Sequence, residues 1–139
     1  MGAARDAQVP LSGLAGAMEL KTFLTELVSG LTLLDFVASI DIRTEAFTLK
    51  GRIHFKERGF LEVYFNEQTQ TVAVAWIEGE RRRWGIDRDN LRGWHRHPLE
   101  NPEDHQAIPA KSIQDIIKEL GEVWRQVHSG PSPGEAESS

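Results

Sequence analysis

The chain has 139 residues, of which 40% are hydrophobic and 27% are charged, an ordinary composition for one globular domain. It contains no cysteine, which excludes disulfide frameworks, thiolate zinc sites, iron–sulfur clusters and cysteine nucleophiles. No apolar run approaches the roughly 20 residues that span a bilayer. We therefore expect a cytoplasmic protein without a membrane partner.

The net charge of −5 is unevenly distributed along the chain. Residues 43–98 include eleven basic and eight acidic residues, so this region has a net charge of +3, and the two flanks together have a net charge of −8. A polyanion responds to the local field rather than to the average charge. The centre of the chain is therefore the region suited to meet a nucleic acid.

The chain begins with an Ala- and Gly-rich stretch, residues 1–16, that we expect to be a disordered lead-in. The next stretch, AMELKTFLTELVSG, predicts an amphipathic helix, and Gly30 is a natural C-terminal stop. Its apolar residues at helical spacing are Leu20, Phe23, Leu24, Leu27 and Val28.

The hydrophobic period then changes to two, which is typical of half-buried strands. Alternation runs through five stretches, residues 33–45, 47–56, 60–66, 71–77 and 80–88. The turns between them are short, so successive strands must pair antiparallel. We expect a meander of about five strands.

Residues 89–109 hold three prolines and almost no periodicity, and they predict a long irregular segment. Helical spacing resumes in KSIQDIIKELGEVWRQVHSG, where Ser112 and Asp115 resemble a capping box. The apolar stripe of this helix is Ile113, Ile116, Ile117, Leu120, Val123, Trp124 and Val127. The composition of residues 129–139 predicts a disordered tail.

This order of elements predicts one α+β domain over residues 17–128, with the N-terminal and C-terminal helices packed on one face of the sheet. We expect Trp84 and Trp124 in the core. The other face would be solvated, basic and would contain Tyr64. Its expected cations are Lys50, Arg52, His54, Lys56, Arg81 and Arg83.

The common nucleotide-binding and hydrolase signatures are missing from the sequence. There is no G-x-x-x-x-G-K-[ST] loop, no G-x-G-x-x-G turn and no G-x-S-x-G elbow. These absences argue against ATP hydrolysis and dinucleotide redox chemistry, and we expect no cofactor.

The segment RDNLRGWHRHPLENPEDH contains three of the five histidines. If the backbone is extended at His95 and His97, both rings point the same way. With His105 and an acid such as Asp89 or Asp104 they could hold Zn²⁺. The same rings could instead serve as acid and base in phosphodiester cleavage. A solvated loop without function is the third interpretation.

Other residues near this segment also allow two interpretations each. Arg83, alternating with Arg81, could clamp a phosphate, or it could have a structural role by protecting an edge strand with its charge or by pairing with Glu78 and Glu80. Asn90 could position a substrate or form a turn. Trp94 could stack on a base or anchor the loop.

The region from about Gly51 to Ile108 resembles the TumE-like toxin family, whose members are small partners in toxin–antitoxin pairs. The residues that carry the resemblance are Arg88, Asp89, Asn90, His95, His97, Pro102 and His105. The resemblance implies a small toxin with an antitoxin protein as its partner.

Our leading interpretation is a toxin-like protein that acts on RNA as a metal-independent ribonuclease. The catalytic set is His95 and His97 as acid and base, His105 assisting, and Asp89 orienting an imidazole. The substrate-binding set is Arg88, Asn90, Arg52, Arg83 and Trp94. The alternatives are a non-enzymatic protein-interaction module and a histidine-bound metal hydrolase.

Overall fold

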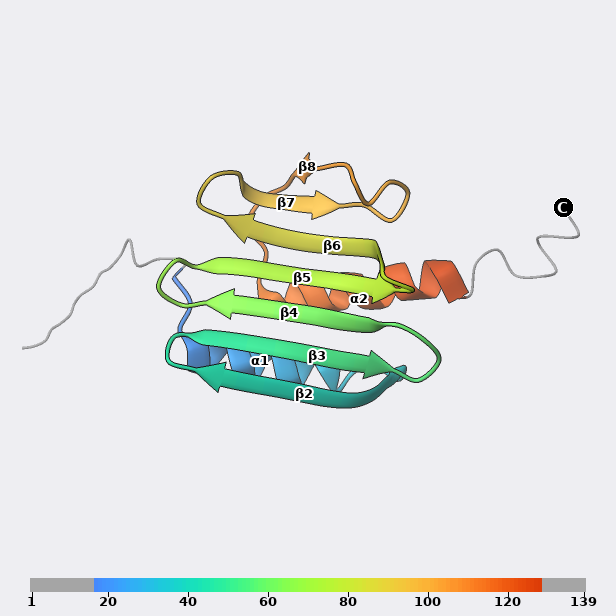
Figure 1. Cartoon of the computed structure of the whole chain (residues 1–139), viewed down its shortest axis with the longest axis horizontal. Coiled ribbons are helices and arrows are strands. Elements are labelled where there is room, and N and C mark those ends of the chain that lie inside the picture. The colour runs from blue at the N-terminus through green and yellow to red at the C-terminus, as the bar shows by residue number, and fades with distance from the viewer. Residues whose placement is uncertain (1–16, 129–139) are drawn as a thin grey trace, which may run out of the picture.

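The computed structural model describes residues 17–128. They form one antiparallel sheet of seven strands with two helices on one of its faces (Figure 1). The predicted α+β class and the placement of both helices on one face are confirmed. The expected lead-in, residues 1–16, and the expected tail, residues 129–139, lie outside the described residues.

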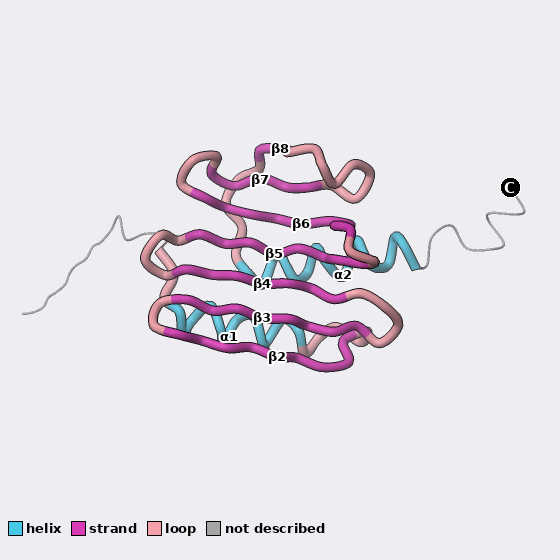
Figure 2. Tube along the Cα trace, in the orientation of Figure 1, coloured by secondary structure: helices cyan, strands magenta, loops and turns pink. Residues whose placement is uncertain are grey.

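The strands pair in chain order from β2 to β8, each antiparallel to its neighbour, and loops join them at the two ends of the sheet (Figure 2). The elements are α1 (Leu20–Leu31), β2 (Val37–Glu45), β3 (Thr48–Phe55), β4 (Phe60–Asn66), β5 (Thr71–Glu78), β6 (Arg81–Asp89), β7 (Gly93–His97), β8 (Gln106–Ala107) and α2 (Ile113–His128).

The segment predicted to be irregular, residues 89–109, contains the last two strands, so the sheet has seven strands rather than about five. Strand β7 has five residues, and Trp94 is its one large apolar side chain. Alternation over so short a stretch was too weak to predict a strand.

The core lies between the sheet and the helices. Alternate residues of the central strands are buried on the helix side, as their period of two predicts. Trp84 and Trp124 are 1% and 7% exposed, which confirms both as core residues. The rings of Phe23 on α1 and Phe65 on β4 stack with centroids 4.3 Å apart.

Of the two helix-end signals predicted from the sequence, the cap at Ser112 is confirmed and the stop at Gly30 is not. The Ser112 hydroxyl accepts a hydrogen bond from the Asp115 backbone N–H at 3.0 Å, which caps α2 as predicted. Gly30, expected as a stop signal, lies inside α1. A Cβ there would come within 3.2 Å of Ile117, so this glycine allows the two helices to pack closely.

No helix within residues 17–128 is long and apolar enough to cross a membrane.

Gly85 on β6 has no room for a side chain. A Cβ there would approach the Val74 carbonyl oxygen to 2.8 Å, and a backbone atom cannot move aside cheaply. We expect Gly85→Ala to lower the free energy of unfolding by about 1–3 kcal/mol, measured by urea denaturation. The matched control is Gly121→Ala on α2, whose Cβ would meet the movable Leu34 methyl at 3.2 Å. Equal urea midpoints for wild type and Gly85→Ala would contradict this account.

Candidate functional site

The histidines of β7 lie on the face of the sheet that the helices leave open. The β6–β7 register pairs Asp87 with His95 and Gly85 with His97. The alternate pairs of the same strands face the helices, because successive side chains of a strand point to opposite faces. Asp87, His95 and His97 therefore share the open face.

The chain between β7 and β8 brings a third ring to the same place. The His105 ring centroid lies 5.4 Å from that of His95 and 4.6 Å from that of His97. Ring nitrogens of the three residues all lie within 4.8 Å of one another. The structure thus brings the three predicted histidines together, and we call His95, His97 and His105 the histidine cluster.

The rings differ sharply in exposure. His95 is 3% exposed and His97 is 6% exposed, whereas His105 is exposed to solvent. The Nδ1 atom of His95 lies 3.2 Å from the Gly93 carbonyl oxygen, and that of His97 lies 3.0 Å from the Pro102 carbonyl oxygen. The two buried rings are therefore fixed in place, and solvent reaches the cluster at His105.

The carboxylate at the cluster is Asp87, a residue that sequence reasoning did not single out. Its Oδ2 lies 3.1 Å from Nε2 of His97 and 3.6 Å from Nε2 of His95. The Arg82 guanidinium lies 3.7 Å from the same oxygen. Asp87 occupies a polar position in the alternation of β6, so recognising β7 as its partner strand would have found it.

Burial lowers the pKa of His97, and the nearby charge of Arg82 lowers this pKa further, while Asp87 opposes the shift. The balance favours the neutral ring of His97.

Asp89, expected to orient an imidazole, instead shapes the turn between β6 and β7. Its Oδ1 accepts hydrogen bonds from the backbone N–H groups of Arg92 at 2.7 Å and Leu91 at 2.9 Å. The Arg92 backbone contact is the largest influence that lowers the pKa of Asp89. Asp104 accepts a hydrogen bond from the backbone N–H of His105 at 2.9 Å.

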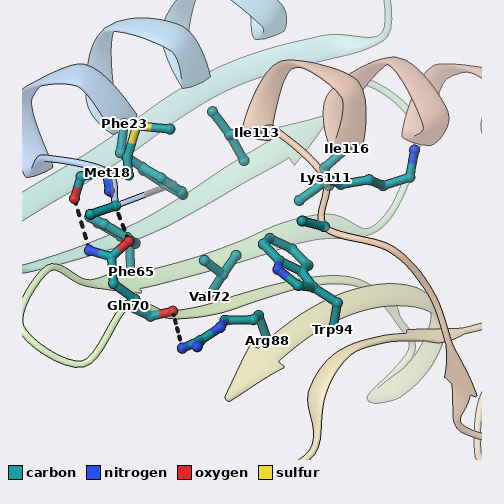
Figure 3. Close-up of a pocket in the computed structure, with 12 residues that line it drawn as sticks. Met18, Phe23, Phe65, Gln70, Val72, Arg88, Trp94, Lys111, Ile113 and Ile116 are labelled. Carbon is teal, nitrogen blue, oxygen red and sulfur yellow. Dashed lines mark hydrogen bonds between the residues drawn. The ribbon is translucent and has the colours of Figure 1, made fainter. Parts of the chain in front are cut away.

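Arg88, Asn90 and Trp94 are not brought to the histidine cluster. Arg88 donates to the carbonyl oxygens of Thr69 and Gln70 and to the Asn90 side chain, at 2.9–3.1 Å. Arg88 and Trp94 line a cavity of about 380 Å³ on the helix side of the sheet (Figure 3). The other residues that line this cavity include Phe23, Phe65 and Ile113, and none of the lining residues is a histidine.

The predicted phosphate ligands Arg52 and Arg83 also lie apart from the cluster. Arg52 on β3 pairs with Glu62 and lies over the Phe60 ring at 4.2 Å. Arg83 pairs with Glu78 at the start of β6. Arg82 is the arginine that reaches the cluster, because the β5–β6 register shifts between Trp76 and Ile77 and changes which arginine faces the open side.

A second polar group fixes β7 from the helix side. Glu119 on α2 accepts hydrogen bonds from Arg96 at 2.7 and 2.8 Å and from the Trp84 indole at 3.1 Å, and the Lys111 ammonium lies 3.3 Å away. Burial opposes ionisation of Glu119, but these contacts outweigh it and hold its pKa below the usual range. The hydrogen bond to Glu119 raises the pKa of Arg96. Arg96 lies between the two buried histidines, so its ion pair anchors their strand.

No family model, curated protein or solved structure matches this chain. The resemblance to the TumE-like toxin family therefore stays a prediction, and the functional argument depends on the geometry of the cluster.

Proposed function

We propose that the protein cleaves phosphodiester bonds of RNA at the histidine cluster, as the toxin-like component of a toxin–antitoxin pair. The observation that carries the proposal is the convergence of three imidazoles and the Asp87 carboxylate on an open sheet face. Such groups can take up and release protons or stabilise charge at a scissile phosphate. The family resemblance adds an antitoxin protein as the partner.

In this proposal, the roles of the side chains follow their exposure. A substrate would approach from the side of His105, the one exposed ring. Arg82, whose side chain is 35% exposed, would neutralise phosphate charge as a fixed donor. Because His95 and His97 are buried, they are suited to hold a small ion or a water molecule at the centre of the cluster rather than to touch the substrate themselves.

The open face offers a path for a single strand toward the cluster. The β-ladder aligns one row of open-face positions across the sheet: Arg43, Lys50, Tyr64, Ala73, Asp87 and His95. Cations that track a phosphate backbone and an aromatic ring on which a base can stack are the usual features of single-strand binding. Ala73 has a small side chain, so this row has no bulky side chain between Tyr64 and Asp87. This row supports RNA as the substrate.

The test is cleavage of a labelled single-stranded RNA by the purified full-length chain. We expect the wild type to cleave the RNA and to spare its 2′-deoxy counterpart, because the 2′-hydroxyl is the attacking nucleophile. His105→Ala should lower the cleavage rate by at least about 100-fold. The matched control is His54→Ala, which removes an exposed histidine of β3 on the same face.

Intact RNA with the wild-type protein, assayed with and without added Zn²⁺, would refute the proposal. So would equal cleavage rates for His105→Ala and the wild type. In cells, the toxin interpretation adds that induced wild-type protein arrests growth and that His105→Ala does not.

A further inference from the structure

The two buried imidazoles are held in one tautomer by their surroundings. A backbone carbonyl oxygen only accepts hydrogen bonds, so the Nδ1 atoms of His95 and His97 must be the donors to Gly93 and Pro102. With Nδ1 as the donor, Nε2 of each ring is directed toward the centre of the cluster. Nε2 of His97 lies within hydrogen-bond distance of Asp87 Oδ2, at 3.1 Å, and it donates there only when it carries a proton of its own.

Several polar atoms meet at the centre of the cluster. Nε2 of His97 and Nε2 of His95 lie 3.1 and 3.6 Å from the same carboxylate oxygen, Asp87 Oδ2, and the Arg82 guanidinium lies 3.7 Å from it. Nε2 of His95 and Oδ1 of Asp87 are buried and have no hydrogen-bond partner among residues 17–128. Buried polar atoms without partners cost free energy. A cation at this centre gives Nε2 of His95 a partner and is attracted by the Asp87 carboxylate.

We propose that Asp87, His95, His97 and His105 form a binding site for a divalent transition-metal ion, with Zn²⁺ as the preferred occupant. The ligand atoms are Nε2 of the two buried histidines, a ring nitrogen of His105 and Oδ2 of Asp87. Zinc–nitrogen bonds of about 2.0–2.1 Å require ligand nitrogens about 3.3 Å apart. The ring nitrogens already lie within 4.8 Å, and the exposed His105 ring can close the remaining gap.

The donor set decides the class of metal. Imidazole nitrogens suit Zn²⁺, Co²⁺, Ni²⁺ and Cu²⁺, whereas Mg²⁺ and Ca²⁺ prefer sites built from oxygen alone. Metal-binding histidines usually donate their second ring N–H to a carbonyl or carboxylate, which fixes the ring for the metal. The contacts of His95 with Gly93 and of His97 with Pro102 supply this arrangement.

Metal binding itself is independent of the RNA cleavage proposed above, but a catalytic role of the ion rests on that function. With four protein ligands, water would be a fifth ligand of the ion on the exposed side, near His105, and the ion would supply a hydroxide there. The hydroxide takes the proton of the RNA 2′-hydroxyl and becomes water. The 2′-oxygen bonds to phosphorus, the bond to the 5′-oxygen breaks, and that oxygen takes up a proton from the water just formed, which restores the hydroxide. The products are a 2′,3′-cyclic phosphate and a 5′-hydroxyl.

The experiment uses full-length protein made without a histidine tag and treated with a chelator. This protein is titrated with Zn²⁺, Co²⁺ and Mg²⁺, and binding is followed by calorimetry and, for Co²⁺, by visible absorption. We expect one Zn²⁺ per chain, a visible Co²⁺ spectrum of imidazole ligation and no competition by Mg²⁺. Loss of a second-sphere partner weakens metal binding about 10–100-fold, so loss of a direct ligand in His105→Ala should weaken it at least about 100-fold. Asp87→Asn should also weaken it, and His54→Ala should not.

The controls separate this inference from the proposed function. Circular dichroism of each variant shows whether it is folded, and His105 is exposed, so its replacement removes no core contact. Zn²⁺ affinity that is unchanged in both His105→Ala and Asp87→Asn overturns the metal site. Stoichiometric Zn²⁺ binding without RNA cleavage leaves the metal site standing and overturns the proposed function. Full cleavage by metal-free protein overturns the catalytic role of the ion and leaves the proposed function standing.

Discussion

Replacing Trp124 by alanine is expected to lower the free energy of unfolding by about 3–5 kcal/mol. The indole stacks on Phe36 with centroids 4.1 Å apart and meets Phe55 and Trp76 at 4.9 and 5.3 Å. It therefore joins α2 to the entry of β2, the end of β3 and β5. Its removal leaves a cavity among aromatic rings that cannot collapse without moving the helix.

The measurement for Trp124→Ala is urea denaturation followed by far-ultraviolet circular dichroism, since the variant loses one of the four indoles that give the fluorescence signal. Trp124→Phe should recover part of the loss, because it restores the stack on Phe36. Gln126→Ala, at an exposed position of the same helix, serves as the matched control. A Trp124→Ala midpoint equal to that of Gln126→Ala would show that the aromatic cluster does not hold the helix.

Glu119→Gln is expected to lower the free energy of unfolding by about 2–3 kcal/mol at neutral pH. The change removes the charge that Arg96 and Lys111 compensate, but it keeps the shape of the side chain and an oxygen for the Trp84 indole. The side chains of Glu119 and Arg96 are 16% and 27% exposed, so solvent screens the pair only in part. Glu122→Gln, an exposed change on the same helix, is the control.

The ion pair between Glu119 and Arg96 should also make the free energy of unfolding depend on pH. The pKa of Glu119 is lower in the folded than in the unfolded chain, so folding is stabilised when the group is ionised. The stabilisation is complete above the unfolded glutamate pKa, about 4.3, and is lost as the pH falls through the lower folded value. Urea midpoints of wild type and Glu119→Gln should therefore converge in acid. A constant difference at all pH values would contradict the assignment.

Hydrophobic period was sufficient to predict both helices and the five long strands. Leu49, Ile53, Leu61 and Val74 are buried on the side where alternation placed them. The hydrophobic period was insufficient at β7 and β8, because β7 has five residues with one large apolar side chain and β8 has only two residues. Pairing of β7 with the edge of β6, and of β8 with β7, makes them strands.

The sequence was sufficient to predict the histidines of the candidate site, but not the charged residues next to them. His95, His97 and His105 are clustered in sequence, and the structure brings their rings together. Asp87 and Arg82 depend on the register of two strand pairs, including the irregularity after Trp76, which composition and spacing do not encode. For the same reason Arg88 was expected at the histidines and lies on the helix side.

All four proposed ligands come from one contiguous run of chain, residues 87–105, and Arg82 precedes it by five residues. Bringing them together requires only short loops to close, so little chain entropy is lost. The same locality ties the ligands to the margin of the sheet at β7 and β8, where strands separate more readily than those in the middle. Transient fraying of this margin would scatter the ligands while the centre of the protein stays native. A drop in activity would then be a poor gauge of global unfolding.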